Sequence, residues 1–207
     1  MNTFFKLRNY ALIALMASSV VLTSCGDDDD DDVPEPVNEV EVITDVKLIF
    51  TNSNDASDVV EARAQDPDGQ GVQELAILDT INLDTSKTYI LTYEIFNNLE
   101  TPGEDIGAEI LAEDDEHQIF FSFTDGAFSS PTGNGNFDNA ADPINYNDLD
   151  DNNIEVGLNT TWTTPSTMTA NGSFRARLQH QPGVKTATST VNTGDTDFDL
   201  EFVINIQ

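Results

Sequence analysis

The chain has 207 residues, of which 38 are Asp or Glu and only 8 are Lys or Arg, so its formal net charge is -30. A surface this acidic repels phosphate backbones, which excludes nucleic acid as a partner. The chain contains one cysteine, so it forms no internal disulfide and its fold depends on core burial. Its length fits one domain of ordinary size behind a short N-terminal extension.

Two basic residues and no acid precede an apolar run from Tyr10 to Leu22. This run is shorter than the roughly 20 apolar residues that a transmembrane helix needs, and its order is typical of a secretory signal. The run ends in Leu22-Thr23-Ser24-Cys25-Gly26, which resembles the bacterial lipobox. The resemblance implies that residues 1–24 are removed and that acylated Cys25 anchors the chain in a membrane. The alternative is an ordinary signal with a chance cysteine.

Six consecutive aspartates, Asp27 to Asp32, follow the cysteine and cannot bury themselves, so they stay solvated and extended. Together with Val33-Pro34-Glu35-Pro36 they make residues 25–39 a tether and leave 40–207 as one domain. The tether lifts the domain off the membrane. Acidic residues directly after an acylated cysteine also resemble the export signal of some Gram-negative lipoproteins, which implies the outer face of the outer membrane.

Alternating apolar and polar residues predict several half-buried strands in the domain. The clearest runs are Val40–Phe50, Thr88–Phe96, Phe174–Leu178 and Phe198–Ile206, and the weaker ones are Val59–Ala64, Leu75–Ile81, Gln118–Phe123, Ile154–Leu158 and Thr167–Ala170. Asn171-Gly172 lies between two short runs and predicts a hairpin turn. Many short strands with turns between them predict a mainly β protein, a single antiparallel β-sandwich of the Ig or transthyretin-like kind.

One short inserted helix is expected in this β domain. Thr101-Pro102-Gly103-Glu104 has the pattern of a capping box with proline at the first helical position, and the helix is expected to reach about His117. On a helical wheel Glu113 and His117 share the apolar face, and Glu109 borders it. The face that should be apolar therefore ends in a carboxylate and an imidazole.

The two histidines of the chain are both predicted to point inward, because His180 continues the apolar side of the strand that contains Leu178. Glu109, Glu113 and His117 are spaced i, i+4, i+8, so one ion could join adjacent members, with His180 arriving from the sheet. Such nitrogen and oxygen ligands suit zinc, copper or another divalent transition metal. The alternative is two partly buried histidines, each hydrogen-bonded to a carboxylate or carbonyl.

Two acidic loops have the composition of calcium sites. Asp66 and Asp68 lie in a D-x-D-G-x-G segment, and Asp148 and Asp150 lie in the oxygen-rich segment 147–155. Calcium takes 6–8 oxygen ligands, and neither loop completes the twelve-residue pattern of an EF-hand. The alternative is an ordinary Asp/Gly turn in an acidic protein.

A long stretch, Thr124 to Asn153, is rich in Gly, Asn and Asp and poor in periodicity, and a loop of this length is usually functional or disordered. It carries Phe137 and Tyr146, and Trp162 follows it. These three aromatic residues are candidates for contacts with a glycan or a protein, because aromatic rings stack on sugars. The alternative is that the single tryptophan packs in the core or at its rim.

Four pieces are spread over most of the domain: Asp66–Gly71, Glu109–Glu113 with Glu116–Phe121, Leu178–Lys185 and Gly194–Asp199. Their spacing resembles a set of small Gram-negative surface lipoproteins, often named type 1 periplasmic binding fold superfamily proteins. The resemblance implies a surface address and a family without an assigned activity.

The sequence lacks the G-x-S-x-G and H-E-x-x-H motifs, so we do not expect an enzyme. The expected function is a non-catalytic, lipid-anchored surface binding protein with a metal site, an accessory of an outer-membrane transporter. The alternative is a glycan- or protein-interaction module without a metal.

Overall fold

Alternating side chains decide which face of each strand is buried. In β1 (Asp45–Asn52) every second residue is buried, and Val46, Leu48 and Phe50 are at most 1% exposed. The computed structural model describes residues 41–66, 68–69, 74–99 and 101–207, which belong to one compact unit. The predicted signal, Cys25 and the tether lie outside the described residues. Within the described part of the chain, no helix is long and apolar enough to cross a membrane.

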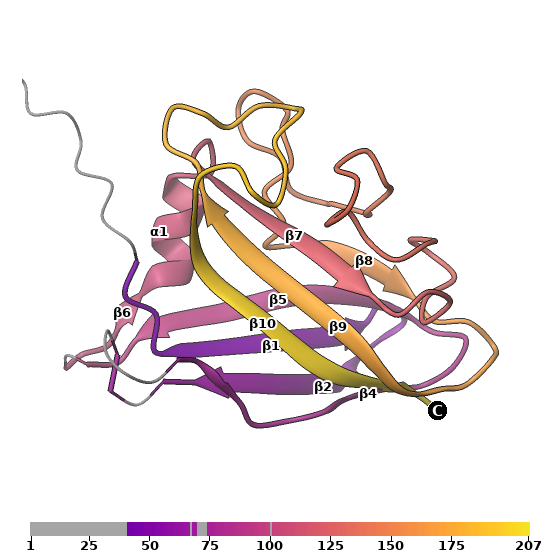
Figure 1. Cartoon of the computed structure of the whole chain (residues 1–207). Coiled ribbons are helices and arrows are strands. Elements are labelled where there is room, and N and C mark those ends of the chain that lie inside the picture. The colour runs from indigo at the N-terminus through magenta and orange to yellow at the C-terminus, as the bar shows by residue number, and fades with distance from the viewer. Residues whose placement is uncertain (1–40, 67, 70–73, 100) are drawn as a thin grey trace, which may run out of the picture. The chain divides into compact units, whose positions relative to one another are not determined.

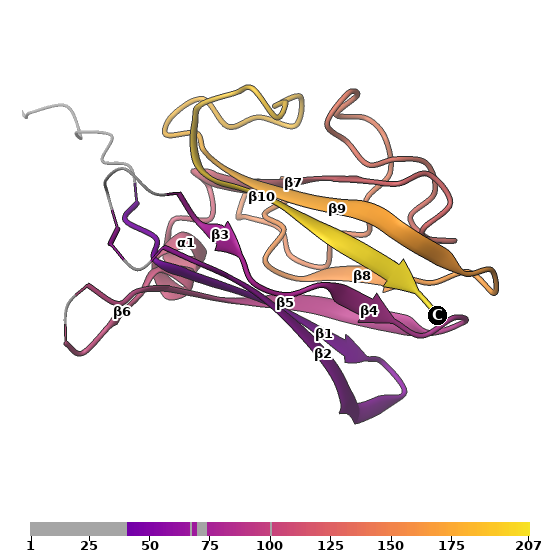
Figure 2. The ribbon, with the colours of Figure 1, turned by 60° about the horizontal axis from the view of Figure 1, so that its bottom comes forward.

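Two β-sheets make the domain mainly β, and they lie face to face as two layers in the manner of a sandwich (Figure 2). The first sheet has the order β3-β2-β1-β5-β6, and β8 also pairs with β5. Besides β1, its strands are β2 (Asp55–Gln65), β3 (Ala76–Ile77), β5 (Thr88–Asn97), β6 (Glu104–Asp105) and β8 (Thr160–Thr163). All of its pairs are antiparallel.

The second sheet has four strands in the order β4-β10-β9-β7 (Figure 1). They are β4 (Ile81–Leu83), β7 (His117–Phe123), β9 (Thr169–His180) and β10 (Asp195–Ile206). β10 and β9 pair antiparallel, as do β9 and β7, but β4 runs parallel to β10. The architecture is therefore mainly but not entirely antiparallel.

The space between the sheets is filled by aromatic and aliphatic side chains. Trp162 on β8 is completely buried, and its ring contacts Phe121, Phe123, Phe128 and Phe174 at centroid distances of 4.7–5.4 Å. Burial of such large rings is the main stabilising contribution for a domain without disulfides.

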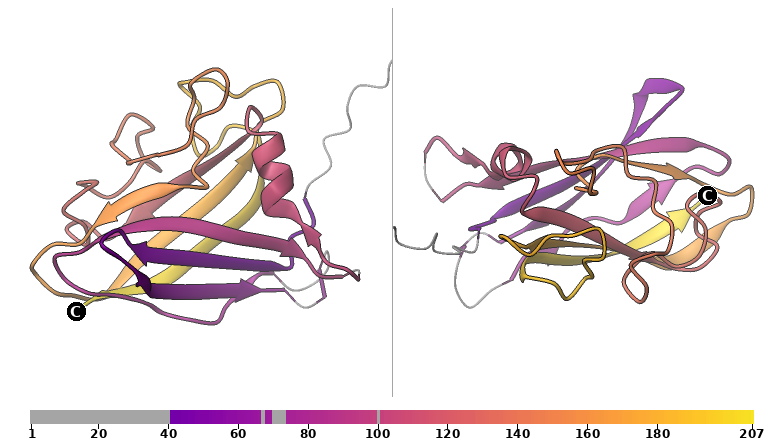
Figure 3. Two further views of the ribbon diagram at one scale, coloured as in Figure 1. Left: turned by 180° about the vertical axis from the view of Figure 1, so that it is seen from behind. Right: turned by 90° about the horizontal axis from the view of Figure 1, so that it is seen from above.

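The helix α1 (Ile106–Ala112) stands at one end of the two layers (Figure 3). It is shorter than expected and ends before Glu113. Its N-cap is Asp105, whose side chain accepts a hydrogen bond from the Ala108 amide, so the capping box predicted at Thr101–Glu104 is wrong. Only Ile106 and Ile110 of the helix are buried. Because a seven-residue helix has two turns, it closes the end of the core without extending to the histidine.

Three strand predictions need correction. Asn171-Gly172 is not a hairpin turn but an irregularity within the continuous strand β9, where Asn171 has a φ of 53° and the pairing with β10 shifts by one residue. Leu75–Ile81 holds only the two-residue β3 and the start of β4. Ile154–Leu158 has no strand, and only an isolated bridge joins Glu155 to Leu149.

The connection between β7 and β8, which contains the stretch 124–153, is held against the domain. Isolated bridges join Ser130 to Thr163, Tyr146 to Thr160 and Gly135 to Ser122. At Gly135 a Cβ atom would collide with the backbone of Phe121, so only glycine allows this close approach. The long loop is therefore ordered and pairs with the edge of β7 and with β8.

Candidate metal centre

The two histidines meet at the end of the second sheet. His117 is the first residue of β7, His180 is the last residue of β9, and the two are directly opposite in the strand register. Their rings are stacked with centroids 4.4 Å apart and an interplanar angle of 4°. Both sit on the face that Ile119 and Leu178 turn toward the core. The prediction that His117 lies on the helix is wrong, but strand alternation gives it the same inward direction.

His117 is held in the tautomer that suits a metal ligand. Its Nδ1 lies 3.1 Å from the Glu113 carbonyl oxygen, and because a carbonyl only accepts, Nδ1 must donate. Nε2 then carries the lone pair, and it has no hydrogen-bond partner among the described residues. Burial lowers the pKa of His117 to about 4, and His180 and Lys185 add to this effect. The ring is therefore neutral at neutral pH, as metal binding requires.

Asp197 is brought to the histidines by a β-bulge. The β10–β9 pairing shifts between Thr196 and Phe198, so Asp197 is an extra residue in the ladder. A bulge redirects the side chain, and here the carboxylate turns inward although strict alternation would point it outward. Its Oδ2 lies 3.8 Å from His117 Nε2, and both side chains are 0% exposed.

The buried Asp197 carboxylate is poorly compensated. Neither oxygen has a hydrogen bond of normal geometry to the described residues. Burial raises the pKa of Asp197 to about 7, and His180 and the backbone of Glu41 only partly offset this. A buried carboxyl that is only partly compensated costs free energy unless a proton or a metal ion neutralises it.

Two glutamates complete the set of donors. The Glu116 Oε2 atom lies 3.5 Å from His180 Nε2, and one ligand atom each of Glu113, His117 and His180 lie within 4.8 Å of one another. Both ring nitrogens of His180 lack a hydrogen bond within the described part of the chain. The predicted members Glu113, His117 and His180 are therefore brought together.

These distances fit the approach to a metal ion. Ligand atoms about 2.1 Å from a tetrahedral ion lie about 3.4 Å from one another, slightly closer than the 3.5 and 3.8 Å pairs seen here. The stacked rings must turn so that both Nε2 atoms face one point. Two imidazoles with one or two carboxylates form a donor set for zinc or copper. The residues present therefore fit the predicted group.

The turn that carries the glutamates is fixed from two sides. The Gln181 amide donates to the Glu116 carbonyl at 2.6 Å, which joins the turn to the end of β9. Lys185 Nζ donates to the Asp114 carbonyl at 2.6 Å and lies 3.1 Å from Asp150 Oδ2. Lys185 and Asp150 have side chains 1% and 0% exposed, so this ion pair is fully buried. The loop after β9 thus holds the turn over the histidine pair.

Glu109, by contrast, is not a member of the cluster. It lies on α1 one turn before Glu113, and burial followed by the charges of Glu104 and Glu41 raises its pKa. Because the helix ends at Ala112, the i, i+4, i+8 face that placed Glu109 beside His117 does not exist. The prediction of Glu109 as a ligand was wrong because it assumed a helix that continued to His117.

The loop predicted to bind calcium through Asp148 and Asp150 uses both carboxylates internally. Asp148 accepts hydrogen bonds from the amides of Gly157 and Asn159, both at 3.0 Å. Asp150 accepts from its own loop at Ile154 and faces the Lys185 ammonium. An ammonium already neutralises this carboxylate, which argues against calcium there.

Asp66 and Asp68 form a short turn. The Asp66 side chain accepts hydrogen bonds from the amides of Asp68 and Gly69, and its interaction with Asp68 raises the pKa of Asp68. Other positions of the predicted calcium segment, Pro67 and residues 70–71, lie outside the described residues. Asp66 therefore serves as a turn cap, and calcium here stays a prediction.

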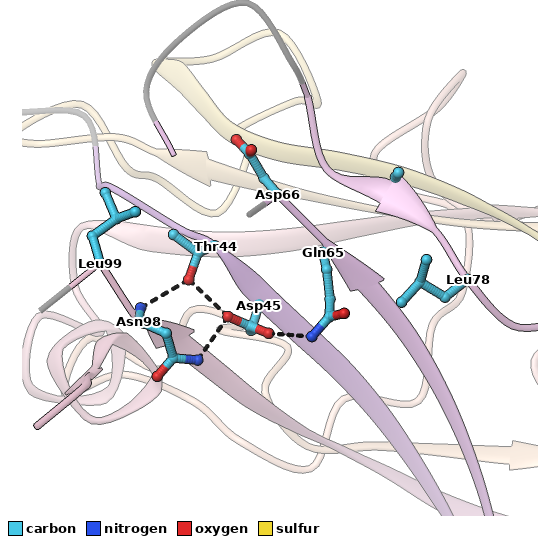
Figure 4. A pocket seen from close by; sticks show the side chains of 8 residues that line it. Thr44, Asp45, Gln65, Asp66, Leu78, Asn98 and Leu99 are labelled. Carbon is cyan, nitrogen blue, oxygen red and sulfur yellow. Dashed lines mark hydrogen bonds between the residues drawn. The ribbon is translucent and has the colours of Figure 1, made fainter. Parts of the chain in front are cut away.

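Asp66 also borders a groove of about 460 Å³ at the start of β1 (Figure 4). The polar atoms on its floor bind one another: Asp45 accepts from Thr44, Gln65 and Asn98 at 2.6–2.7 Å. These hydrogen bonds lower the pKa of Asp45 against the opposing effect of its burial. The Asp45 carboxylate of this groove is thus satisfied without a ligand.

The three aromatic candidates do not form an exposed platform. Trp162 is 0% exposed, so it packs in the core, and its Nε1 donates to Thr160 Oγ1 at 2.7 Å. Phe137 is half-buried and lies under the guanidinium groups of Arg175 and Arg177, at 5.2 and 5.3 Å from the ring centroid. The Tyr146 hydroxyl donates to the Ile119 carbonyl at 2.7 Å. Sugar stacking on Trp162 is therefore ruled out by its burial.

Two residues of the centre were not predicted. Asp197 stands at an outward position of an alternating strand, so its sequence gives no sign of burial. Glu116 precedes His117 directly, which is a signal of proximity that the helical interpretation obscured. No protein-family model, no curated protein and no solved structure matches this chain.

Proposed function

We propose that this chain is a lipid-anchored surface protein that binds a divalent transition metal, zinc or copper. The observation that carries the proposal is the buried group of His117, His180 and Asp197, in which five nitrogen and oxygen atoms lack hydrogen-bond partners among the described residues. Each unsatisfied buried polar atom costs about 1–3 kcal/mol. An ion coordinated by these atoms would offset that cost.

The geometry favours this over purely structural histidines. Within the described part of the chain, His117 makes a hydrogen bond through Nδ1, His180 makes none, and both Nε2 atoms stay open. The hydrogen bond to the Glu113 carbonyl orients the ring as the outer contacts of metal-binding histidines do. Glu116 and Glu113 stand at the partly exposed side, where an ion would enter.

A binding role accounts for the site better than catalysis. His117 and Asp197 are 0% exposed and His180 only 8%, so the donors surround the position of the ion and leave little room for a substrate. Closed sites with four protein ligands are typical of structural or storage metals, whereas catalytic sites keep an open position. We therefore propose a non-catalytic protein.

The cellular address is part of the same proposal. The lipobox-like Cys25 and the aspartate tether support an anchor in the outer membrane with the domain facing the exterior. A metal-capturing domain at that surface would act as an accessory of an outer-membrane transporter. The acidic composition supports attraction of cations and no role with nucleic acid. The Ig or transthyretin-like kind of sandwich belongs to this proposal as well.

Metal titration of residues 26–207 tests the proposed site. Zinc and copper calorimetry on wild type, His117→Ala, His180→Ala and Asp197→Asn should show one site whose Kd rises at least about 100-fold in either histidine variant. Glu109→Gln is the matched control, because Glu109 was a predicted ligand but lies outside the cluster, and it should bind as wild type does.

The controls separate binding from folding. Circular dichroism of each variant must show the β-rich spectrum of the wild type before its affinity is compared. Wild-type protein that binds neither metal, or variants that bind as tightly as wild type, would remove the metal centre from the proposal.

A further inference from the structure

A second, separate cavity lies on the outer face of β7, beneath the loop that joins β7 to β8 and the loop after β9. Its volume is about 280 Å³, and its wall is mostly polar. The polar residues that line it include Gln118, Asn136, Tyr146, Glu155, Thr186 and Ser189. Such a volume is close to the lower limit for small-molecule sites, about 300 Å³.

Gln118 supplies a buried acceptor that the protein does not use. Its side chain is 5% exposed, and Oε1 has no hydrogen-bond partner among the described residues. Its cross-strand partner Gln179 is also buried, but there the amide nitrogen donates to the Val191 carbonyl and Oε1 accepts from Thr196. Because a buried acceptor without a partner is costly, Gln118 points to a ligand that donates a hydrogen bond.

The wall formed by Asn136 and Tyr146 is held in place by hydrogen bonds within the protein. Asn136 accepts from the Phe121 amide and donates to the Tyr146 hydroxyl, which in turn donates to Ile119. Burial raises the pKa of Tyr146, so the phenol stays neutral. The rigid chain from Phe121 to Tyr146 preorganises one side of the cavity, which lowers the entropic cost of binding.

The charges around the cavity define the ligand. Glu155 and Asp142 line it, and no lysine or arginine of the described residues does, so an anion is repelled. Pro143 and Ile144 add a small apolar wall. Carboxylate and amide oxygens beside an apolar patch match a molecule with several hydroxyl donors and a C–H face.

We propose that this cavity binds a neutral polyhydroxylated ligand about the size of one sugar residue. A ring hydroxyl donates to Gln118 Oε1, a second donates to Glu155, and the Ser189 hydroxyl borders the same space. The site is independent of the metal centre, because Gln118 and His117 are consecutive in β7 and so face opposite sides of the sheet. A metal-free protein should bind the ligand equally well.

The test is NMR on residues 26–207 labelled with ¹⁵N, following the side-chain amide of Gln118. The probes are methyl glycosides of glucose, galactose, mannose, N-acetylglucosamine and fucose, each up to about 20 mM, which detects even millimolar binding. We expect at least one glycoside to shift this amide saturably. Gln118→Met and Glu155→Gln should each weaken binding at least about tenfold, and Gln65→Met in the groove of Figure 4 should not change it.

Three results would overturn the proposal. If no glycoside shifts the Gln118 amide, the cavity holds water only. If calcium or ammonium chloride shifts it and no glycoside does, the cavity is a cation site. If a glycoside binds with the same affinity in folded Gln118→Met and Glu155→Gln, the sugar sits elsewhere. Glu155 is partly exposed, so Glu155→Gln should fold normally. This variant therefore still tests the proposal if Gln118→Met does not fold.

Discussion

The substitution Asp197→Asn should change how stability depends on pH. The folded-state pKa of Asp197 is about 7, against 3.8 for the free side chain, because burial disfavours the charged form. The folded state therefore holds this proton more tightly than the unfolded state. The stabilisation is complete below the unfolded pKa and is lost as the pH rises through 7. Asparagine has nearly the same shape as aspartate but does not ionise, so the Asp197→Asn variant does not lose this stability as the pH rises.

The magnitude follows from the two pKa values. About three pKa units correspond to about 4 kcal/mol in total. About 3 kcal/mol of this should appear between pH 4 and pH 7, as an increase in the unfolding free energy of Asp197→Asn minus that of the wild type. His117 is protonated over part of this range, but it is present in both proteins and cancels in the difference. Unpaired amide hydrogens of the asparagine add a cost that does not depend on pH.

Urea unfolding in EDTA, followed by the fluorescence of buried Trp162, measures this difference at several pH values. Adding zinc provides a second test, because only the wild type has the full set of ligands. At pH 8 and 100 times its Kd, zinc should raise the unfolding free energy of the wild type by about 2.7 kcal/mol, and that of Asp197→Asn should rise by less. A difference that stays constant from pH 4 to pH 8 would show that Asp197 is not held as a buried carboxyl, and our account of the centre would fail.

Lys185→Met should lower the unfolding free energy by about 3–5 kcal/mol in urea, because it leaves a buried carboxylate unpaired. Trp162→Ala should cost about 3–5 kcal/mol through the cavity that it creates, while the folded fraction still binds zinc in calorimetry. Gly194→Ala should raise the zinc Kd, because its Cβ would collide with the backbone of His180; Gly126→Ala has the same φ of 79° and no neighbour, and should leave the Kd unchanged. Equal affinities of these two glycine variants would contradict that coupling.

The alternation of apolar and polar residues was sufficient to predict most strands and the inward direction of one histidine. Alternation marked β1, β5, β9 and β10 because a strand between core and solvent buries every second side chain. The same rule correctly predicted that the side chain of His180 points inward. The helix was the weakest prediction, since Thr101–Glu104 looked like a cap while the helix starts at the Asp105 cap and ends after seven residues.

The lipobox-like segment, the run of aspartates and the extreme charge are visible in the sequence alone, because they depend only on the order and type of neighbouring residues. The candidate metal centre depends on contacts between residues far apart in the sequence: 63 positions separate His117 from His180, and 80 separate His117 from Asp197. Strand register sets His117 against His180, and a bulge, which is a property of the paired ladder, turns Asp197 inward. Only the tertiary structure decides such pairings, because register is set by how whole strands pack and leaves no mark on a single residue.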